Sequence, residues 1–382
     1  MKKAKRLDSV KEYYFSRKLK EVSRMMNSGK PIINMGIGSP DIEPNPSVVK
    51  ALNSAMSHPR AHMYQSYQGL PELRKTISSF YKKHYDVNLN PESEVLPLMG
   101  SKEGIMHLSM AFLNSGDEVL IPNPGYPTYS SVAGLMEAKT IFYDLNPSKN
   151  WQPDFEFLDH LDTSKVKIMW LNYPHMPTGT DVSVETFDKL ILWARQRDIL
   201  LINDNPYSFI LTEKPQSILS RPYAKEVAVE LNSLSKSFNM AGWRVGMMIG
   251  NEKVLTQALK VKSNMDSGML FGIQQGAIEA LNMTPDWFYE LNKVYKKRRE
   301  LMKNLIKKLG ARIEKEGVGL FLWARLPKGL NNSEAFIDRI LKEKNIFITP
   351  GTVFGSQGEG YIRFSLCVSE EKIKEAIKRF ES

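Results

Sequence analysis

The chain has 382 residues, of which 42% are hydrophobic and 25% charged, and this balance excludes a disordered, collagen-like or disulfide-stapled protein. Its length exceeds what one ordinary core supports, so we expect two or three domains. The 52 Lys and Arg residues outnumber the 42 Asp and Glu residues; the net charge of +10 permits anionic partners but names none. The only cysteine is Cys367, and the sequence has neither an apolar signal core nor a run of about 18 apolar residues. We therefore expect a cytoplasmic protein with no membrane partner.

Helical and strand-like patterns alternate between Lys50 and Gly250. Pro71 opens a helical pattern that reaches His84, and another helix fits residues 187–194. Seven short apolar runs are typical of strands, at 95–99, 118–121, 140–143, 167–171, 199–202, 227–231 and 245–249. Apolar strands separated by helices predict an α/β fold, with a mostly parallel seven-stranded sheet sandwiched by helices. We assign this large domain to residues 46–285.

The pattern changes after about residue 286. A long amphipathic helix ends near Gly310, strand-like segments follow at 319–324, 346–349 and 361–366, and helices are expected at 333–344 and from about 369. These elements predict a smaller α+β domain over residues 286–382, which the N-terminal arm, residues 1–45, joins. The basic run Lys296–Arg299 lies largely on the polar face of the long helix. We interpret it as solvent-facing and expect no nucleic-acid partner.

The most specific segment is Ser233–Gly246, which reads SLSKSFNMAGWRVG. It follows an apolar strand, which puts Lys236 at the carboxyl end of a strand, where ligands bind in such sheets. Arg244 follows eight residues later. Nearby positive charge and partial burial lower a lysine's pKa, so this arrangement suits an amine nucleophile beside a phosphate-binding cluster. For Lys236 alone, a surface lysine in a Ser-rich turn is the simpler alternative.

The whole segment resembles the pyridoxal-phosphate lysine motif of the class I and II aminotransferases, the fold-type I enzymes that include aspartate aminotransferase. By that resemblance, Lys236 would form the Schiff base with the cofactor. Ser233, Ser235 and Arg244 would hold the cofactor phosphate. The resemblance continues, in the expected order, over nearly the whole chain.

Asp204 ends a buried strand 32 residues before Lys236, and Tyr207 follows it. A pyridoxal ring acts as an electron sink only with its ring nitrogen protonated, which calls for a buried carboxylate. In the family's Asp-x-x-Tyr pattern the aspartate pairs with that nitrogen and the tyrosine bonds the ring hydroxyl. A turn or helix cap is the alternative for Asp204 considered alone.

Two further segments match the family's cofactor loops. Gly100, Ser101 and Lys102 stand between a strand and a helical pattern, and a helix N-terminus binds phosphate. The resemblance implies Ser101 and the Lys102 backbone as phosphate ligands. Tyr126, in the segment NPGYPTY, would stack on the cofactor ring; without the family context it reads equally as an aromatic plug in a Pro-rich turn.

One segment departs from the family pattern. The sequence LNYPHMPTG at 171–179 resembles the loop Asn-Pro-x-Asn-Pro-Thr-Gly, but Met176 replaces the asparagine that bonds the ring hydroxyl. A thioether cannot donate a hydrogen bond. Tyr207 alone, Asn172 or a water molecule would have to serve instead. A change in reaction preference is one expected consequence.

The resemblance also implies residues for substrate and subunit contacts. Arg363, in the segment GYIRFSL, would grip the substrate α-carboxylate, for which a planar bidentate guanidinium is well suited. Ile37 and Gly38 would contact substrate. Tyr64 would reach the phosphate of a neighbouring subunit, which implies a homodimer with shared active sites.

We therefore predict a pyridoxal-phosphate aminotransferase. It would move the α-amino group of an L-amino acid to a 2-oxo acid, for which we expect 2-oxoglutarate, by a ping-pong mechanism. Lys236, Asp204 and Tyr207 are the predicted catalytic residues, and no metal is expected. A carbon–sulfur β-lyase or another pyridoxal-phosphate enzyme on the same fold is the main alternative. A ligand sensor is the other, although binding alone would not require Lys236 together with Asp204. The amino-acid side chain that is recognised stays open.

Overall fold

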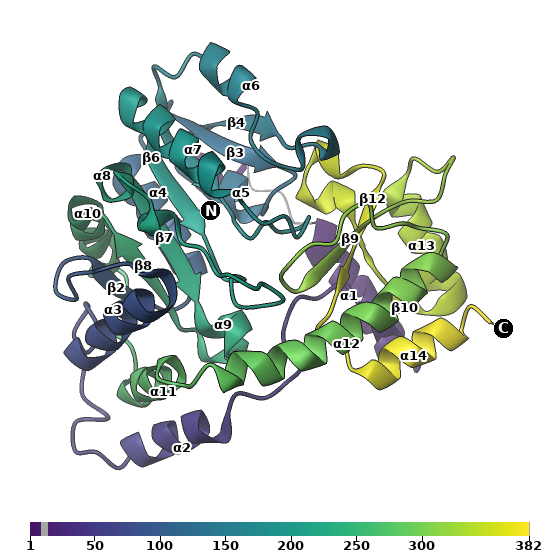
Figure 1. The fold of residues 1–382 in the computed structure, drawn as a ribbon, viewed down its shortest axis with the longest axis horizontal. Coiled ribbons are helices and arrows are strands. Elements are labelled where there is room, and N and C mark those ends of the chain that lie inside the picture. Colours follow the sequence, from purple (N-terminus) through teal and green to yellow (C-terminus); the bar gives the residue numbers. More distant parts are fainter. Residues whose placement is uncertain (9–13, 382) are drawn as a thin grey trace.

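The computed structural model describes residues 1–8 and 14–381 (Figure 1). Residues 9–13 of the predicted N-terminal arm lie outside the described residues. The α-helices are α1 Tyr14–Asn27, α2 Pro46–Ala55, α3 Pro71–Tyr85, α4 Ser101–Phe112, α5 Thr128–Leu135, α6 Phe155–His160, α7 Val184–Arg197, α8 Ala224–Val227, α9 Leu234–Ser237, α10 Glu252–Lys262, α11 Phe271–Leu281, α12 Asp286–Lys308, α13 Ser333–Lys344 and α14 Glu370–Lys378. Among these helices, none combines the length and apolarity that a bilayer span requires.

A seven-stranded sheet forms the centre of the larger part of the molecule. Its strands are β2 Val95–Leu98, β3 Glu118–Asn123, β4 Lys139–Asp144, β5 Val166–Leu171, β6 Leu200–Asp204, β7 Ala228–Ser233 and β8 Gly246–Gly250, in the order β2-β8-β7-β6-β5-β3-β4. Only the two pairings made by β8 are antiparallel. The predicted mostly parallel seven-stranded sheet is therefore confirmed, and each predicted apolar run coincides with one of its strands.

Helices cover both faces of this sheet. On one face α4, α5 and α10 enclose a core that includes Ile105, Tyr129 and Trp170. On the other face α3, α7 and α11 pack against a larger core that includes Tyr81 and Phe187. Apart from the edge strand β4, the strands are buried on both faces, which explains why their sequences are continuously apolar rather than alternating.

The smaller part of the molecule is built from both ends of the chain, as predicted. Strand β1 (Ile33–Asn34) pairs in parallel with β10 (Ile346–Phe347), and β11 (Thr349–Pro350), β12 (Tyr361–Ser365) and β9 (Phe321–Arg325) form an antiparallel sheet. The predicted strand at 346–349 is thus split, because its two halves pair with different partners. The long helix α12 runs from the large part to the small one (Figure 1). The domain boundaries at 45 and 285 stay a prediction.

The basic run on α12 is only partly solvent-facing, so our interpretation of it was wrong for its second half. Lys296 and Lys297 are exposed, but Arg298 is 5% exposed. The Arg298 guanidinium lies 2.6 Å and 2.9 Å from the two carboxylate oxygens of Asp41, and it donates to the Leu366 carbonyl.

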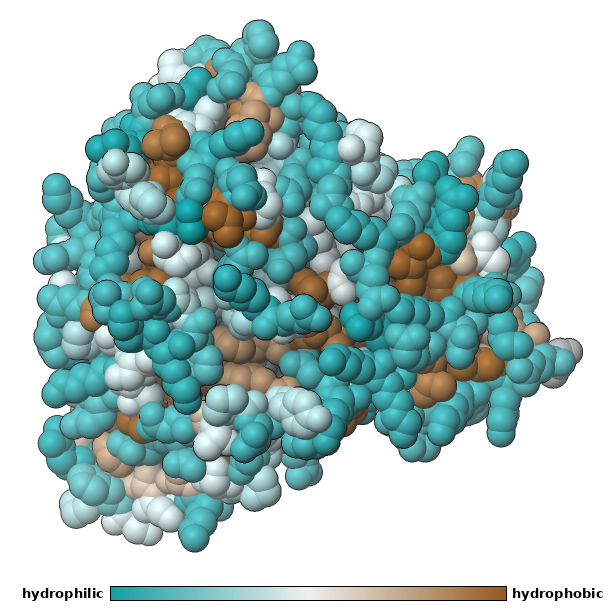
Figure 2. Space-filling model, in the orientation of Figure 1, coloured by the Kyte–Doolittle hydropathy of each residue, from teal (hydrophilic) through white to brown (hydrophobic). Residues whose placement is uncertain are grey.

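The face of the molecule seen in Figure 2 is mainly hydrophilic, with small separate hydrophobic areas.

We expect Arg298→Ala to lower the free energy of unfolding by about 2–3 kcal/mol, because it removes a largely buried bidentate ion pair. Lys297→Ala is the matched control. Lys297 pairs with Glu370 at the surface, and its loss should change stability by less than about 0.5 kcal/mol. Urea unfolding of both variants measures the difference; equal effects would contradict a structural role for Arg298.

Candidate active site

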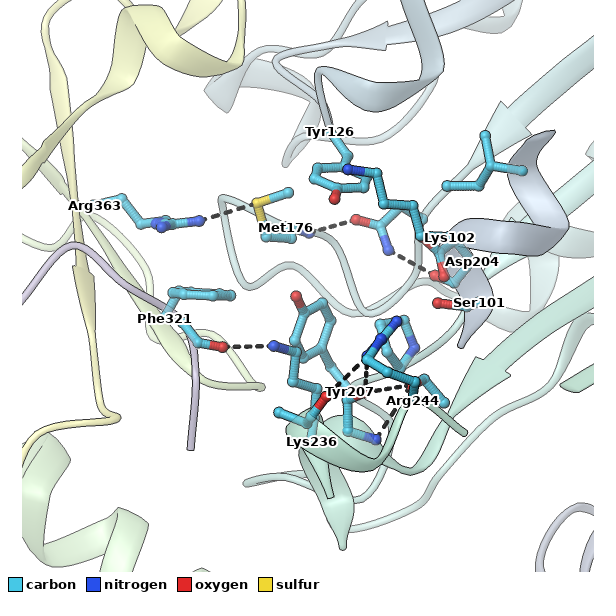
Figure 3. A pocket seen from close by; sticks show the side chains of 17 residues that line it. Ser101, Lys102, Tyr126, Met176, Asp204, Tyr207, Lys236, Arg244, Phe321 and Arg363 are labelled. Atoms are coloured by element: carbon cyan, nitrogen blue, oxygen red, sulfur yellow. Dashed lines mark hydrogen bonds between the residues drawn. The ribbon is translucent and has the colours of Figure 1, made fainter. Parts of the chain in front are cut away.

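A cavity of about 290 Å³ lies where the carboxyl ends of β5, β6 and β7 meet the segments from the smaller part (Figure 3). It is the place where a parallel sheet of this kind binds ligands. Most of the predicted site residues line it: Gly38, Ser101, Lys102, Tyr126, Asn172, Asp204, Tyr207, Ser233, Ser235, Lys236, Arg244 and Arg363. Segments as distant as 38 and 363 therefore converge on one space.

Three predicted residues do not line the cavity. Gly100 lies directly beneath Arg244, because a Cβ atom on this glycine would be 2.0 Å from Arg244 Nη2. Ile37 is 38% exposed beside Gly38. Tyr64 is 90% exposed and does not reach the cavity of its own chain.

Lys236 stands on the short helix α9, directly after β7. Its Nζ donates to the Gly38 carbonyl at 2.5 Å. Burial lowers the pKa of Lys236, and the positive charges of Arg363 and Arg244 act in the same direction. On its other side Gly38 lies against Phe321, where a Cβ atom would be 2.4 Å from the ring. The pKa of Lys236 therefore lies below that of a solvent-exposed lysine, which is the direction that a general base requires.

Asp204 ends β6 and is 6% exposed. Its Oδ2 accepts a hydrogen bond from the Tyr129 hydroxyl at 2.9 Å, whereas its buried Oδ1 has no partner among the described residues. Burial raises the pKa of Asp204 to about 6, against the opposing effects of the Tyr129 hydrogen bond and the Lys236 charge. An unpaired, buried carboxylate oxygen calls for a cationic N–H partner.

Met176 lies between Asp204 and Arg363 (Figure 3), and Asn172 lines the same cavity. The Asn172 amide donates to the Asp204 backbone carbonyl at 2.6 Å, and its Oδ1 accepts the Met176 N–H at 3.0 Å. Asn172 is therefore engaged in holding the loop. Met176 faces Arg363 instead, with 3.3 Å between its sulfur and Arg363 Nη1. Burial raises the pKa of Tyr207, which keeps its hydroxyl protonated.

The other end of the cavity is rich in donors. Ser101 and Lys102 begin α4, whose first backbone N–H groups have no partners within the helix. The Ser233 hydroxyl donates to Ser235 Oγ at 2.9 Å, and Arg244 Nη1 donates to Ser235 Oγ at 3.3 Å. Backbone amides, hydroxyls and a guanidinium together suit a phosphate group.

Arg363 is a buried cation on β12, 6% exposed. Its guanidinium lies 4.0 Å from the Phe321 ring centroid and 4.7 Å from that of Phe354. Its Nη2 donates to the Gly36 carbonyl at 2.6 Å, and its Nε has no partner among the described residues. Burial lowers the pKa of Arg363 to about 10, so it stays charged at neutral pH. It forms no ion pair within the described part of the chain, which leaves it available for a ligand carboxylate.

Sequence reasoning missed two neighbours of these residues. Tyr129 bonds Asp204 and stacks on Trp170, with 4.7 Å between the ring centroids. It ends the quoted segment that holds Tyr126, so a second tyrosine was visible there, and the structure places it in the first turn of α5. Phe321 lies between Arg363 and Gly38, but an aromatic residue in a predicted strand gives no signal of this kind.

The residues present fit pyridoxal phosphate. The unpaired Asp204 oxygen suits a protonated ring nitrogen, the donor-rich end of the cavity suits a phosphate, and Lys236 lines the same cavity. Four cationic side chains (Lys102, Lys236, Arg244 and Arg363) line the cavity against the single carboxylate of Asp204. The charge balance favours anionic ligands.

Comparison with known proteins gives a consistent result. The family model of aminotransferase class I and II matches residues 30–380. The LL-diaminopimelate aminotransferase of Aquifex aeolicus is 38% identical, over 99% of this chain and 98% of its own, and that of Halothermothrix orenii is 38% identical over 100% and 98%. Among solved structures, substrate-bound BacF of Bacillus subtilis has a TM-score of 0.95 and 34% identity, over 99% of this chain and 97% of its own.

An aminotransferase structure from Staphylococcus aureus has a TM-score of 0.90 and 31% identity, covering 99% of this chain and 98% of its own. The predicted fold, cofactor and reaction class are thereby confirmed. The chain belongs to the class I and II aminotransferases and is a pyridoxal-phosphate-dependent aminotransferase.

Proposed function

We propose that the residues of the cavity divide the transamination chemistry as follows. Pyridoxal phosphate, when bound, withdraws electrons from the substrate's Cα and carries the amino group between the two substrates. The Lys236 amine anchors the cofactor and moves the Cα proton as general acid and base. Its lowered pKa supports this role, because a neutral amine can accept a proton.

The remaining roles follow from charge and position. Asp204 keeps the ring nitrogen protonated through its unpaired Oδ1, and Tyr207 donates to the ring hydroxyl oxygen. Arg363 binds the substrate α-carboxylate and thereby orients the Cα–H bond towards Lys236. Ser101, Ser233, Ser235, Arg244 and the Lys102 backbone hold the phosphate, while Ile37 and Gly38 border the substrate and Tyr126 covers the ring.

We further propose LL-diaminopimelate as the amino donor and 2-oxoglutarate as the acceptor. The observation that carries the donor is the full-length identity of 36–38% to proteins named LL-diaminopimelate aminotransferase. Diaminopimelate has a second, distal carboxylate. The exposed Lys102 side chain lines both the cavity and an adjoining groove, and it has no ion pair within the described residues. Its ammonium is suited to that distal carboxylate.

A half-reaction screen tests the substrate. Purified holoenzyme is mixed with one amino acid at a time, and the cofactor absorbance and the released 2-oxo acid are followed. We expect LL-diaminopimelate to convert the cofactor fastest, ahead of aspartate and aromatic amino acids. Conversion by aspartate or aromatic amino acids alone would overturn the proposal that LL-diaminopimelate is the donor. Pyruvate with ammonia or sulfide from cystathionine would instead favour the β-lyase.

Lys102→Met is the matched variant in the same screen. It should lower kcat/KM for LL-diaminopimelate about tenfold or more and leave monocarboxylic amino acids within about twofold, because one charge-assisted contact is lost. An equal loss for both groups would exclude distal recognition by Lys102.

We also propose a homodimer in which Tyr64 acts in the active site of the partner subunit. Its 90% exposure and its distance from its own cavity support this arrangement. Sedimentation should therefore give twice the chain mass of 43.6 kDa. Tyr64→Phe should weaken cofactor binding. A monomer with full activity would contradict the proposal.

A cytoplasmic location is supported by the buried, unpaired Cys367.

The raised pKa of Asp204 predicts a pH effect in the cofactor-free protein. Asp204 has a pKa of about 6 when folded and about 3.9 when unfolded, so the unfolded chain loses its proton first. The tighter binding of this proton by the folded protein stabilises the fold fully below pH 4, and this stabilisation is lost as the pH rises to 6. Asp204→Asn should escape this loss and be more stable than wild type by up to about 3 kcal/mol above pH 6. Urea unfolding between pH 4.5 and 7 measures it, and parallel pH profiles would contradict it.

A further inference from the structure

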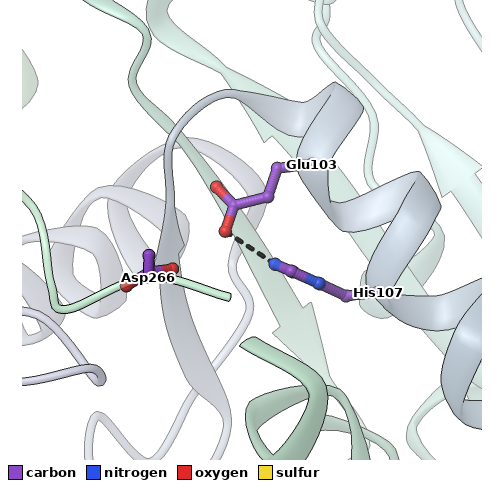
Figure 4. A group of neighbouring side chains, drawn as sticks. All are labelled: Glu103, His107 and Asp266. Carbon is purple, nitrogen blue, oxygen red and sulfur yellow. Dashed lines mark hydrogen bonds and ion pairs between the residues drawn. The ribbon is translucent and has the colours of Figure 1, made fainter. Parts of the chain in front are cut away.

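A second cluster of charged side chains, which includes Glu103, His107 and Asp266, lies at α4, the helix whose first residues line the donor-rich end of the cavity (Figure 4). Glu103 and His107 come from the first turns of α4, Lys262 ends α10, and Asp266 follows in the next turn. The side chains are between 0% and 7% exposed. None of them lines the cavity, so none is accounted for by the proposed chemistry.

The cluster supplies its own cation. The Lys262 ammonium lies 2.5 Å from Asp266 Oδ2 and 3.8 Å from Glu103 Oε1. The ligand atoms of Glu103, His107 and Asp266 lie within 4.8 Å of one another, a spacing that would suit a metal ion. Because the lysine ammonium already contacts both carboxylates, the structure favours an internal ion-pair network there.

Glu103 uses this network to hold the backbone before the helix. Its Oε2 accepts the Met99 N–H, and its Oε1 accepts from His107 Nε2 at 2.6 Å. Met99 immediately precedes Gly100 and the start of α4. On the other side, Gly100 (φ +90°) lies so close to Arg244 that no side chain fits between them. Glu103 therefore holds the loop on one side through the Met99 N–H, and Arg244 packs against Gly100 on the other.

We propose that Glu103, held by Lys262 and His107, is a positioning residue for the phosphate of the cofactor. It sets the path of residues 99–102 and so aims the N–H groups at the start of α4. Hydrogen bonds weaken steeply when donors turn away from their acceptor, so a small shift of this loop would weaken phosphate binding. The inference rests on the proposed phosphate site at Ser101 and Arg244.

The test compares pyridoxal phosphate with pyridoxal, which lacks the phosphate, in binding to the cofactor-free enzyme. For Glu103→Ala we expect about tenfold weaker binding of pyridoxal phosphate, the effect of one lost hydrogen bond, and pyridoxal within about twofold of wild type. Lys262 keeps Asp266 as a partner in this variant. Glu103→Gln retains an acceptor for Met99 and should show a smaller loss of the same selectivity. A circular dichroism spectrum like that of wild type shows that each variant is folded.

Control variants distinguish a wrong positioning role for Glu103 from a wrong phosphate site. Glu290→Ala removes an exposed ion pair with Lys293 on α12 and should leave both affinities unchanged. Ser101→Ala and Arg244→Ala should selectively weaken pyridoxal phosphate. Suppose that these two variants show that selectivity. The positioning role is then wrong if the folded Glu103 variants weaken both ligands equally or leave both affinities unchanged. If Ser101→Ala and Arg244→Ala also lack selectivity, the phosphate site and the inference built on it both fail.

Discussion

The withdrawal of the Asp204 carboxylate from water is the constraint on which the site depends. Strand β6 is the middle strand of the seven, so its last side chain lies among the ends of neighbouring strands and is only 6% exposed. Tyr129 satisfies one oxygen and the other stays unpaired. A buried negative charge of this kind is costly unless a positive partner faces it. The protonated ring of pyridoxal phosphate would be such a partner, and Lys236, which follows the adjacent strand β7, would anchor it.

The positive charges of the cavity also call for partners of opposite charge. Lys236, Arg244 and Arg363 line one cavity, and within the described residues none of them has a carboxylate in ion-pair range. Other buried arginines are paired, as Arg298 is with Asp41. The cavity therefore holds cations without carboxylate partners where anionic cofactor and substrates would bind, whereas the buried cation Arg298 is neutralised by Asp41. Part of the net charge of +10 thus lies at the cavity, and most of it is distributed over the surface.

Much of this arrangement could be predicted from the sequence. Apolar runs separated by helices predicted the sheet, and the motif around Lys236 predicted which strand ends carry the site. What escaped prediction depends on tertiary pairing: strand 346–349 splits because its halves meet different partners, and Arg298 is buried because Asp41, far away in sequence, lies opposite. The loss of the family asparagine at Met176 was visible in the sequence, but its contact with Arg363 was not.

The central claim, that Lys236 is the residue that holds the cofactor, can be tested directly. Holoenzyme is treated with borohydride, which fixes the cofactor onto the amine that carries it, and the labelled peptide is identified by mass spectrometry. We predict a single label on Lys236, lost in Lys236→Ala even though the variant is folded. A label on another lysine, or continued turnover of amino acids by Lys236→Ala, would contradict the account.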